Sequence, residues 1–499
     1  MKKALVILLV CLTFCPGFAS CGGQNDPAGT DIPETSEDIA STVEDRPDLP
    51  SAEEMSDISG EFNILVSGNY AWNDFQAESD NGTPTESAIY RRNAYMKETY
   101  NVDIVNHDVI KFNSANGSGV GYNTIYTDYM SGTYNYDAAI VGTYDVSTLA
   151  YNGYLYDLGN IPYLNLQKDY WDQKANQDLT INGKLYYTTG DITVIDNMLT
   201  HVLLFNKEMI KAYELDDPYT LVRSGNWTWE TFSALVRSVG EDANQDGVRD
   251  SNDIYGLLTW NDGCLAVLAS AGEKICSINA QNQIELTFYN ERVVNLYDMF
   301  TALVYDNSHV FNYQYDYING TNSKNSTWNP TRQKMFDSDQ ALFHFNLLTA
   351  VAKHRDSETD FGILPYPKYD VQQADYGHMV SAFHCGFVCV PEMSKNFERT
   401  GIILEELSYQ GKKLLTPAYY DQTLVGQYTR DEESVDMLDI IFSTRVFDVG
   451  IYYNIGTYKE QLAGLFRNRQ SISSIYETYR NSAETKIKEI NTFFTRLGN

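Results

Sequence analysis

A segment of twelve residues, from Asp242 to Asp253, carries oxygen-bearing groups at the positions that a calcium loop uses. Side-chain oxygens stand at its first, third, fifth, ninth and twelfth positions, and Gly247 stands at the sixth, where the backbone must turn sharply. The seventh residue can offer its backbone carbonyl, and calcium takes about six to eight oxygen ligands. The spacing therefore predicts a calcium site with these ligands: Asp242, Asn244, Asp246, Val248, Asp250 and Asp253.

The twelfth position distinguishes this loop from an EF-hand, which has a longer Glu there that chelates with both oxygens. With Asp253 in its place, the loop resembles those of dockerins and other extracellular calcium sites, and we expect a weaker affinity. All the expected ligands belong to the protein and none is left open for chemistry, so the expected role of Ca²⁺ is structural. The alternative is a solvated acidic turn without a metal.

Directly after the loop, residues 254–260 form a short apolar run of strand type that ends in Trp260, Asn261 and Asp262. An aromatic ring beside an amide and a carboxylate at a strand end suits a polar ring-shaped ligand such as a sugar. These three residues are therefore candidate ligand-binding residues.

The N-terminus has the pattern of a bacterial lipoprotein signal. Two lysines precede an almost wholly apolar run over residues 4–14, which is too short to span a membrane, and small residues precede Cys21. We expect residues 1–20 to be a signal peptide and Cys21 to be lipidated, which anchors the protein outside the cytoplasm on a bacterial membrane. The alternative is ordinary secretion with a free cysteine.

Residues 22–59 are rich in Asp, Glu, Pro, Ser and Thr, and this composition predicts an unfolded, extended tether. The chain as a whole has a formal net charge of −31, which argues against nucleic acid as a partner. Four cysteines follow the tether: Cys264, Cys276, Cys385 and Cys389. They are either buried thiols or include a Cys264–Cys276 disulfide.

The folded part opens with alternating strands and helices. The expected strands are residues 61–68, 102–109 and 136–142, and the expected helices between them are 85–100 and 122–132. This alternation is typical of a parallel α/β sheet, in which ligands bind outside the carboxyl ends of the strands. Tyr70 and Trp72 follow the first strand, and Tyr144 and Asp145 follow the third, so we expect these residues to line one crevice.

The rest of the chain is long enough for a second lobe. An Asn182-Gly183 pair marks a hairpin turn. Residues 197–206 and 341–346 are expected to be extended, and residues 394–410, 431–442 and 471–497 are expected to be helical.

Taken in order, several stretches resemble the extracellular solute-binding proteins of ABC importers, in the carbohydrate-binding family that includes maltose-binding protein. The specific similarity is to long clostridial lipoproteins of that family. The stretches are NYAWNDF, YDAAIVGTYDV, NGYLYDL, DYWDQKANQDLTINGKLYYTTGD, LLFNKEMI, ELDDPY, NWTWETF, DANQDGVRDSNDIYGL, ALFHFN and FGILPYPKYD.

The resemblance implies a monomeric α/β clamp of two hinge-linked lobes, which closes on a small polar solute and presents it to an ABC permease without covalent chemistry. It implies a first lobe of residues 60–195 with 341–390, and a second of residues 196–340 with 391–499. It also places ligand-binding residues at the strand ends of both lobes: Tyr70, Trp72, Tyr144, Asp145, Trp260, Asn261, Asp262 and Asn346.

The expected ligand is a sugar or oligosaccharide, with peptides and other polar solutes left open. Two other functions also stay open. The protein can be a ligand sensor that passes its closed form to a membrane receptor. It can also be a surface glycoside hydrolase with Asp145 and Asp262 as its carboxylates, although no recognised catalytic motif supports this.

Overall fold

The structure is a computed structural model that describes residues 47–50, 57–68, 74–109, 118–314, 328–354, 357–429 and 431–496. The predicted signal peptide, Cys21, most of the tether, Tyr70 and Trp72 lie outside the described residues. Within the described ranges, no helix is both long enough and apolar enough to cross a membrane.

The first sheet has five strands. In spatial order they are β2 (Val102–Asp108), β1 (Gly60–Ser67), β3 (Ala138–Gly142), β14 (Gly386–Cys389) and β4 (Tyr187–Thr188). β1, β2 and β3 run parallel, and β14 runs antiparallel to both β3 and β4. Helices α1 (Pro84–Tyr100) and α2 (Val120–Ser131) connect the parallel strands, which confirms the expected α/β layer. Thr83 caps α1 by accepting a hydrogen bond from the Glu86 N–H at 3.2 Å.

The second sheet has six strands. In spatial order, five of them are β10 (Val310–Asn312), β7 (Ile254–Thr259), β11 (Ala341–Leu347), β5 (His201–Asn206) and β12 (Phe361–Leu364), and β6 (Gly240–Glu241) pairs with β7. β10, β7 and β11 run parallel, and β5 runs antiparallel to β11 and β12. Every residue of β5 and β11 is buried, because helices or loops cover both faces of this sheet.

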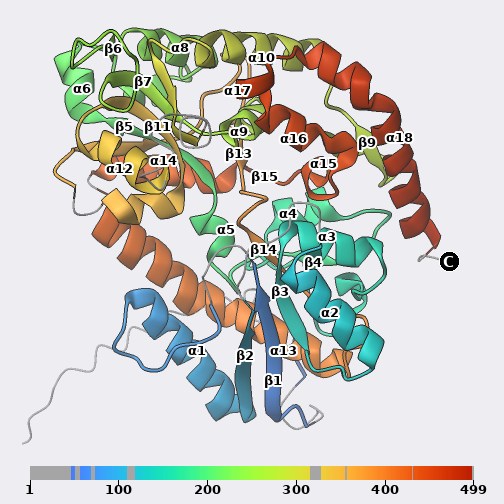
Figure 1. Cartoon of the computed structure of the whole chain (residues 1–499). Helices are drawn as coiled ribbons and strands as arrows, with labels where there is room; N and C mark the ends of the chain where they lie inside the picture. The colour runs from blue at the N-terminus through green and yellow to red at the C-terminus, as the bar shows by residue number, and fades with distance from the viewer. Residues whose placement is uncertain are drawn as a thin grey trace, which may run out of the picture. The chain divides into compact units, whose positions relative to one another are not determined.

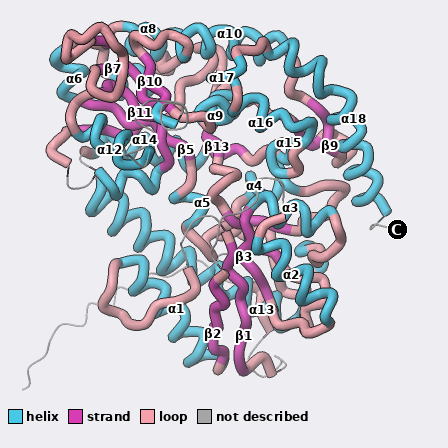
Figure 2. The backbone as a smooth tube through the Cα atoms, in the orientation of Figure 1, coloured by secondary structure: helices cyan, strands magenta, loops and turns pink. Residues whose placement is uncertain are grey.

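Further helices cover the two sheets (Figures 1 and 2). The α-helices are α3 (Thr143–Tyr151), α4 (Gln173–Leu179), α5 (Ile195–Met198), α6 (Lys207–Ala212), α7 (Pro218–Arg223), α8 (Trp229–Arg237), α9 (Gly263–Ser270), α10 (Glu291–Val304), α12 (Trp328–Asp337), α13 (Phe397–Gln410), α14 (Glu432–Ser443), α15 (Val449–Tyr452), α16 (Tyr458–Ala463), α17 (Leu465–Asn468) and α18 (Ile472–Arg496). The 3₁₀-helices are η2 (Leu158–Asn160), η4 (Leu348–His354) and η7 (Ile455–Thr457), and η5 (Gly411–Leu415) and η6 (Ala418–Tyr428) are π-helical. Two short strand pairs complete the fold: β8 (Cys276–Ile278) with β9 (Ile284–Leu286), and β13 (His378–Met379) with β15 (Arg445–Val446).

The sheets divide the chain differently from the expected lobes. β11 and β12 were expected in the first lobe, but they pair with β5 in the second sheet. α13 was expected in the second lobe, but it packs with α1 beside the first sheet. A strand that is buried on both faces is apolar throughout. Such a pattern predicts a strand but does not indicate which other strands that strand pairs with.

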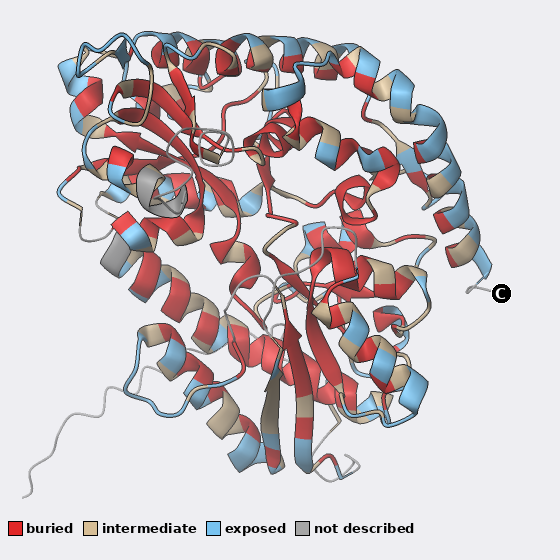
Figure 3. Cartoon of the chain, viewed as in Figure 1, coloured by how far each residue is buried: buried red, intermediate tan, exposed pale blue. Residues whose placement is uncertain are grey.

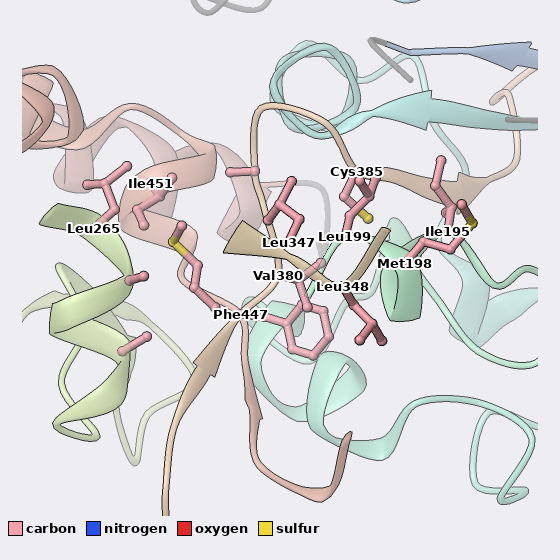
Figure 4. Packing of buried hydrophobic residues seen from close by; sticks show 14 of the residues in the cluster. Ile195, Met198, Leu199, Leu265, Leu347, Leu348, Val380, Cys385, Phe447 and Ile451 are labelled. Carbon is pink, nitrogen blue, oxygen red and sulfur yellow. The ribbon is translucent and has the colours of Figure 1, made fainter. Parts of the chain in front are cut away.

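Residues Arg46–Asn499 form one compact unit. Two chain segments connect a strand of one sheet to a strand of the other: the segment from β4 to β5 contains α5, and the segment from β12 to β14 contains β13. In Figure 1, α5, β13 and β15, which pairs with β13, lie between the sheets. Apolar side chains from these segments pack together in Figure 4, among them Leu199, Val380 and Phe447. Figure 3 shows that the buried residues continue from one sheet through this junction to the other. The four cysteines Cys264, Cys276, Cys385 and Cys389 are buried and free, so no Cys264–Cys276 disulfide is present.

Candidate functional site

One edge of the second sheet collects the ends of four strands. β7, β10 and β11 are parallel, so their carboxyl ends lie at the same edge. β5 is antiparallel to β11 and begins at His201, which pairs with Leu347 at the end of β11. The chain that follows β7 contributes Trp260, and the chain that follows β10 contributes Tyr313. This is the kind of edge at which open α/β sheets bind ligands.

Four aromatic rings form a row along this edge. The Tyr313 and Trp260 rings are stacked with centroids 6.2 Å apart, and the Trp260 and His201 rings are stacked at 5.4 Å with planes only 10° apart. Tyr366 meets His201 edge-on at 6.1 Å. Trp260, a predicted ligand-binding residue, therefore lies within a row of four buried aromatic rings, and 6% of it is exposed.

A buried lysine joins the strand ends of the two sheets. The Lys459 Nζ on α16 lies 3.4 Å from the ring centroid of Tyr144, which follows β3 in the first sheet. Burial raises the pKa of Asp262, which follows β7 in the second sheet, to about 6, although Trp260 and Lys459 oppose that shift. Burial lowers the pKa of Lys459 to about 8, against the opposing charges of Glu460 and Asp262. Two predicted residues, Tyr144 and Asp262, are thus brought together by a third that the sequence did not single out.

Asp145 has a different environment from its neighbour Tyr144. Its Oδ1 accepts a hydrogen bond from the Gly119 N–H at 2.8 Å, and its Oδ2 accepts one from the Tyr122 N–H at 3.3 Å. Gly119 is the N-cap residue of α2 and has no side chain to cap the helix, so Asp145 supplies the missing acceptor. The carboxylate is held against the α2 N-terminus, and its first role is to fix that helix.

The two predicted asparagines also make internal contacts. Asn346 is 1% exposed, its Oδ1 accepts from the Leu347 N–H at 2.9 Å, and its Nδ2 lies 3.2 Å from Nε2 of His344. Asn261 is partly exposed, and its Oδ1 accepts weakly from Nδ2 of Asn312 at 3.4 Å. Of the two, only Asn261 keeps surface at the strand-end edge.

The predicted calcium loop connects the paired strands β6 and β7. Gly247 has φ +79°, so the backbone turns sharply at the expected position. Six of its side-chain oxygens accept hydrogen bonds from backbone N–H groups: Oδ2 of Asp242, Oδ1 of Asn244, Oδ1 of Asp246, Oδ1 of Asp250 and both oxygens of Asp253. Oδ1 of Asp242 is buried without a hydrogen-bond partner. Across the described part of the chain, no three or more His, Cys, Asp or Glu side chains are grouped to hold a metal ion.

An arginine on β15 links the start of α4 to α5. Arg445 on β15 donates from Nη1 to Oδ2 of Asp196 at 2.8 Å and from Nη2 to Oδ2 of Asp172 at 2.6 Å. Asp172 is also the N-cap of α4, and Asp196 lies in α5. Burial raises the pKa of Asp196 to about 6 against the opposing charge of Arg445.

No family model matches the chain, and no curated protein matches it in sequence. Solved structures do match. A galacto-N-biose-/lacto-N-biose I-binding protein of an ABC transporter from Bifidobacterium longum has 11% identity and a TM-score of 0.55, over 87% of this chain and 98% of that one. A cyclic α-maltosyl-1,6-maltose binding protein from Arthrobacter globiformis has 13% identity and a TM-score of 0.54, over 86% and 99%. An ABC substrate-binding protein from Listeria monocytogenes, solved with cycloalternan, has 13% identity and a TM-score of 0.51, over 88% and 99%.

The chain therefore has the two-lobed α/β fold of the solute-binding proteins of ABC importers. The likeness extends over nearly the whole length of each matched protein, so both lobes are present.

Proposed function

We propose that this protein captures a sugar or oligosaccharide between its two lobes and delivers it to an ABC permease, without catalysing a reaction. The observation that carries the proposal is the aromatic row at the strand-end edge, in a chain whose fold is that of sugar-binding proteins. Aromatic faces stack on the C–H faces of sugar rings, and Asp262 and Asn261 beside the row offer polar groups to hydroxyls.

The domain of residues 46–499 is the material for the test, because it forms one compact unit. Thermal melts are recorded with lacto-N-biose, maltotriose, cycloalternan, single amino acids and short peptides. Ligand that binds only the folded state stabilises it by RT ln(1 + [L]/Kd), which is about 2.7 kcal/mol at one hundred times Kd. We expect a rise in Tm with a carbohydrate and none with amino acids. A rise with peptides alone contradicts the sugar assignment.

We also propose that Ca²⁺ binds the loop from Asp242 to Asp253 and has a structural role. The support is the ligand spacing, the sharp turn at Gly247 and the buried unpartnered Oδ1 of Asp242. The loop follows β6 and precedes β7, so an ion there would hold the start of the strand that leads to Trp260.

Finally, we propose that Cys21 carries the lipid anchor and that the protein works as a monomer on the outer face of a bacterial membrane. The support is the sequence of the signal region and the acidic tether after it. Mass spectrometry of the mature protein tests this: a diacylated or triacylated N-terminal cysteine is expected, and an unmodified Cys21 contradicts it.

A further inference from the structure

His201 and Tyr366 carry buried polar atoms that the fold does not satisfy. His201 is 1% exposed and Tyr366 is fully buried. Within the part of the chain that the structure describes, neither ring nitrogen of His201 has a hydrogen-bond partner, and neither has the Tyr366 hydroxyl. Because folded proteins pair most of their buried polar groups, two adjacent residues with three such atoms require an explanation.

The surroundings of the two rings explain why the fold supplies no partner. Trp260 covers the face of His201, and Leu347 lies opposite it in β11. The Tyr366 ring packs on Phe345, with centroids 4.6 Å apart. These contacts are made by apolar or aromatic groups, so they fix both rings in place and leave their polar atoms without a donor or acceptor.

Other histidines of the chain are treated differently. His378 is also buried, yet its Nε2 accepts from the Tyr366 N–H at 3.1 Å and its Nδ1 lies 2.8 Å from the Thr444 hydroxyl. Nδ1 of His384 lies 3.1 Å from the Ser381 hydroxyl. The fold can therefore satisfy an imidazole at this junction. Nδ1 of His344 is also buried without a partner, but its Nε2 lies 3.2 Å from Nδ2 of Asn346, whereas in the described part of the chain His201 lacks a partner at both nitrogens.

The missing partner has a definable chemistry. Burial lowers the pKa of His201 to about 3, with further contributions from His384 and His378, so the ring is neutral and offers one donor and one acceptor. The Tyr366 hydroxyl can also donate or accept. A group that can both donate and accept matches an alcohol hydroxyl of a sugar. A carboxylate offers acceptors only, and an ammonium offers donors only.

We propose that His201 and Tyr366 are specificity-determining residues that hydrogen-bond hydroxyl groups of the ligand at their end of the aromatic row. This inference rests on the proposed function. It goes further by assigning the hydrogen bonds to the sugar to His201, which begins β5, and to Tyr366, which follows β12. Binding of the ligand supplies the hydrogen bonds that the fold leaves unmade.

The test compares the 46–499 domain with His201→Phe, His201→Gln and Tyr366→Phe. Titration calorimetry with lacto-N-biose, maltotriose and cycloalternan gives Kd for each protein. For a sugar that the parent binds, we expect His201→Phe and Tyr366→Phe to raise Kd about tenfold to a hundredfold. His201→Gln keeps a donor and an acceptor, so it is expected to lose less affinity than His201→Phe.

Unliganded stability separates recognition from a structural role. Since the variants remove atoms that have no partner in the fold, Tm without sugar is expected to stay equal or rise in Tyr366→Phe. The matched control is Tyr219→Phe, whose hydroxyl donates to Asp431 at 2.9 Å, and which is expected to lower Tm without changing Kd.

Two different results would contradict the inference, and they differ in what they imply for the proposed function. If the parent binds a sugar and both His201→Phe and Tyr366→Phe bind it with unchanged Kd, the inference is overturned and the proposed function stands. If the parent binds none of the three sugars, both the inference and the proposed sugar function are overturned.

Discussion

Asp145 and Asp262 both follow a strand of their sheet, but their surroundings give them different roles. Asp145 accepts two backbone N–H groups at the start of α2. Asp262 makes no comparable cap and lies in the field of Lys459. A glycosidase needs two carboxylates free to act on one glycosidic bond. Asp145 is instead held against the α2 N-terminus by these two hydrogen bonds.

The raised pKa of Asp262 predicts a pH-dependent effect of its removal. Its pKa in the folded protein is about 6, above the ordinary value of 3.8. The folded state therefore binds a proton more tightly than the unfolded state, and this contribution to stability is lost as pH rises toward 6 and above. An asparagine at this position does not ionise, so Asp262→Asn should be more favourable to stability at pH 7.5 than at pH 4.5, by about 1–2 kcal/mol after allowance for partial solvent contact.

Urea unfolding of the parent and Asp262→Asn at both pH values measures this difference. Asp298→Asn, the same substitution at an exposed position on α10, is the control. An Asp262→Asn effect of equal size at pH 4.5 and 7.5 would show that the carboxylate has an ordinary pKa.

At the level of single residues, the sequence predicted the position of several candidate residues at strand ends, and their role in binding stays a prediction. The strand-end rule located Trp260 and Asp262 beside the aromatic row, and Tyr144 beside Lys459. His201 was visible as a polar residue at the start of an apolar run, but its stacking on Trp260 depends on β5 and β7 flanking β11. No sequence pattern pointed to Lys459. It lies on α16, far along the chain from both Tyr144 and Asp262.

Among the elements, local patterns were predicted and long-range pairings were not. Capping residues, hydrophobic periodicity and turn residues determined α1, α13, α14 and α18 closely, and the Asn182-Gly183 turn is present with both residues at positive φ. The sheet to which β11 and β12 belong was missed, because their partners β5 and β7 are distant in sequence. The first residues of 197–206 form α5 rather than strand, where the chain passes between the sheets.

Arg445 is the charged group on which the junction of the elements depends. It pairs with Asp172 and Asp196, whose side chains are almost fully buried. Removing one partner of a buried ion pair leaves uncompensated charge, at a cost of about 3–5 kcal/mol. We expect Arg445→Ala to lower the free energy of unfolding by this amount.

The control for Arg445→Ala is Arg223→Ala, because Arg223 pairs with Asp436 at 2.9 Å on the exposed surface. An exposed pair contributes about 0–1 kcal/mol, so that variant should remain close to the parent. Guanidinium unfolding curves of the parent and the two variants measure the free energy of unfolding of each. Equal losses in both variants would show that the Arg445 cluster is no more important than a surface pair.

The loop between β6 and β7 carries the metal prediction. If calcium binds there, chelator lowers Tm of the 46–499 domain and excess calcium restores it, since the ion binds only the folded loop. Asp246→Ala should remove most of this difference, and Asp298→Ala, outside the loop, should keep it. Melting curves of the three proteins with calcium and with chelator measure the effect. A parent that melts identically in both conditions would mean that the segment is only an acidic turn.

The whole molecule has two sheets that the chain connects through the segments containing α5 and β13, and such a connection permits hinge motion. The contacts of Lys459 with Tyr144 show that side chains of the C-terminal region reach the strand ends of the first sheet. A sugar bound at the Trp260 row would add further contacts between the lobes. It can favour the closed arrangement over the open one only if it binds the closed arrangement more tightly.

We therefore expect a smaller radius of gyration for the 46–499 domain with saturating sugar than without it, measured by small-angle X-ray scattering. The reason is that a ligand which contacts both lobes stabilises only the closed arrangement, in which both lobes can reach it. A sugar that raises Tm but leaves the scattering profile unchanged would show that it binds one lobe alone. In that case the protein would lack the ligand-dependent change of shape by which a permease could distinguish loaded from empty protein.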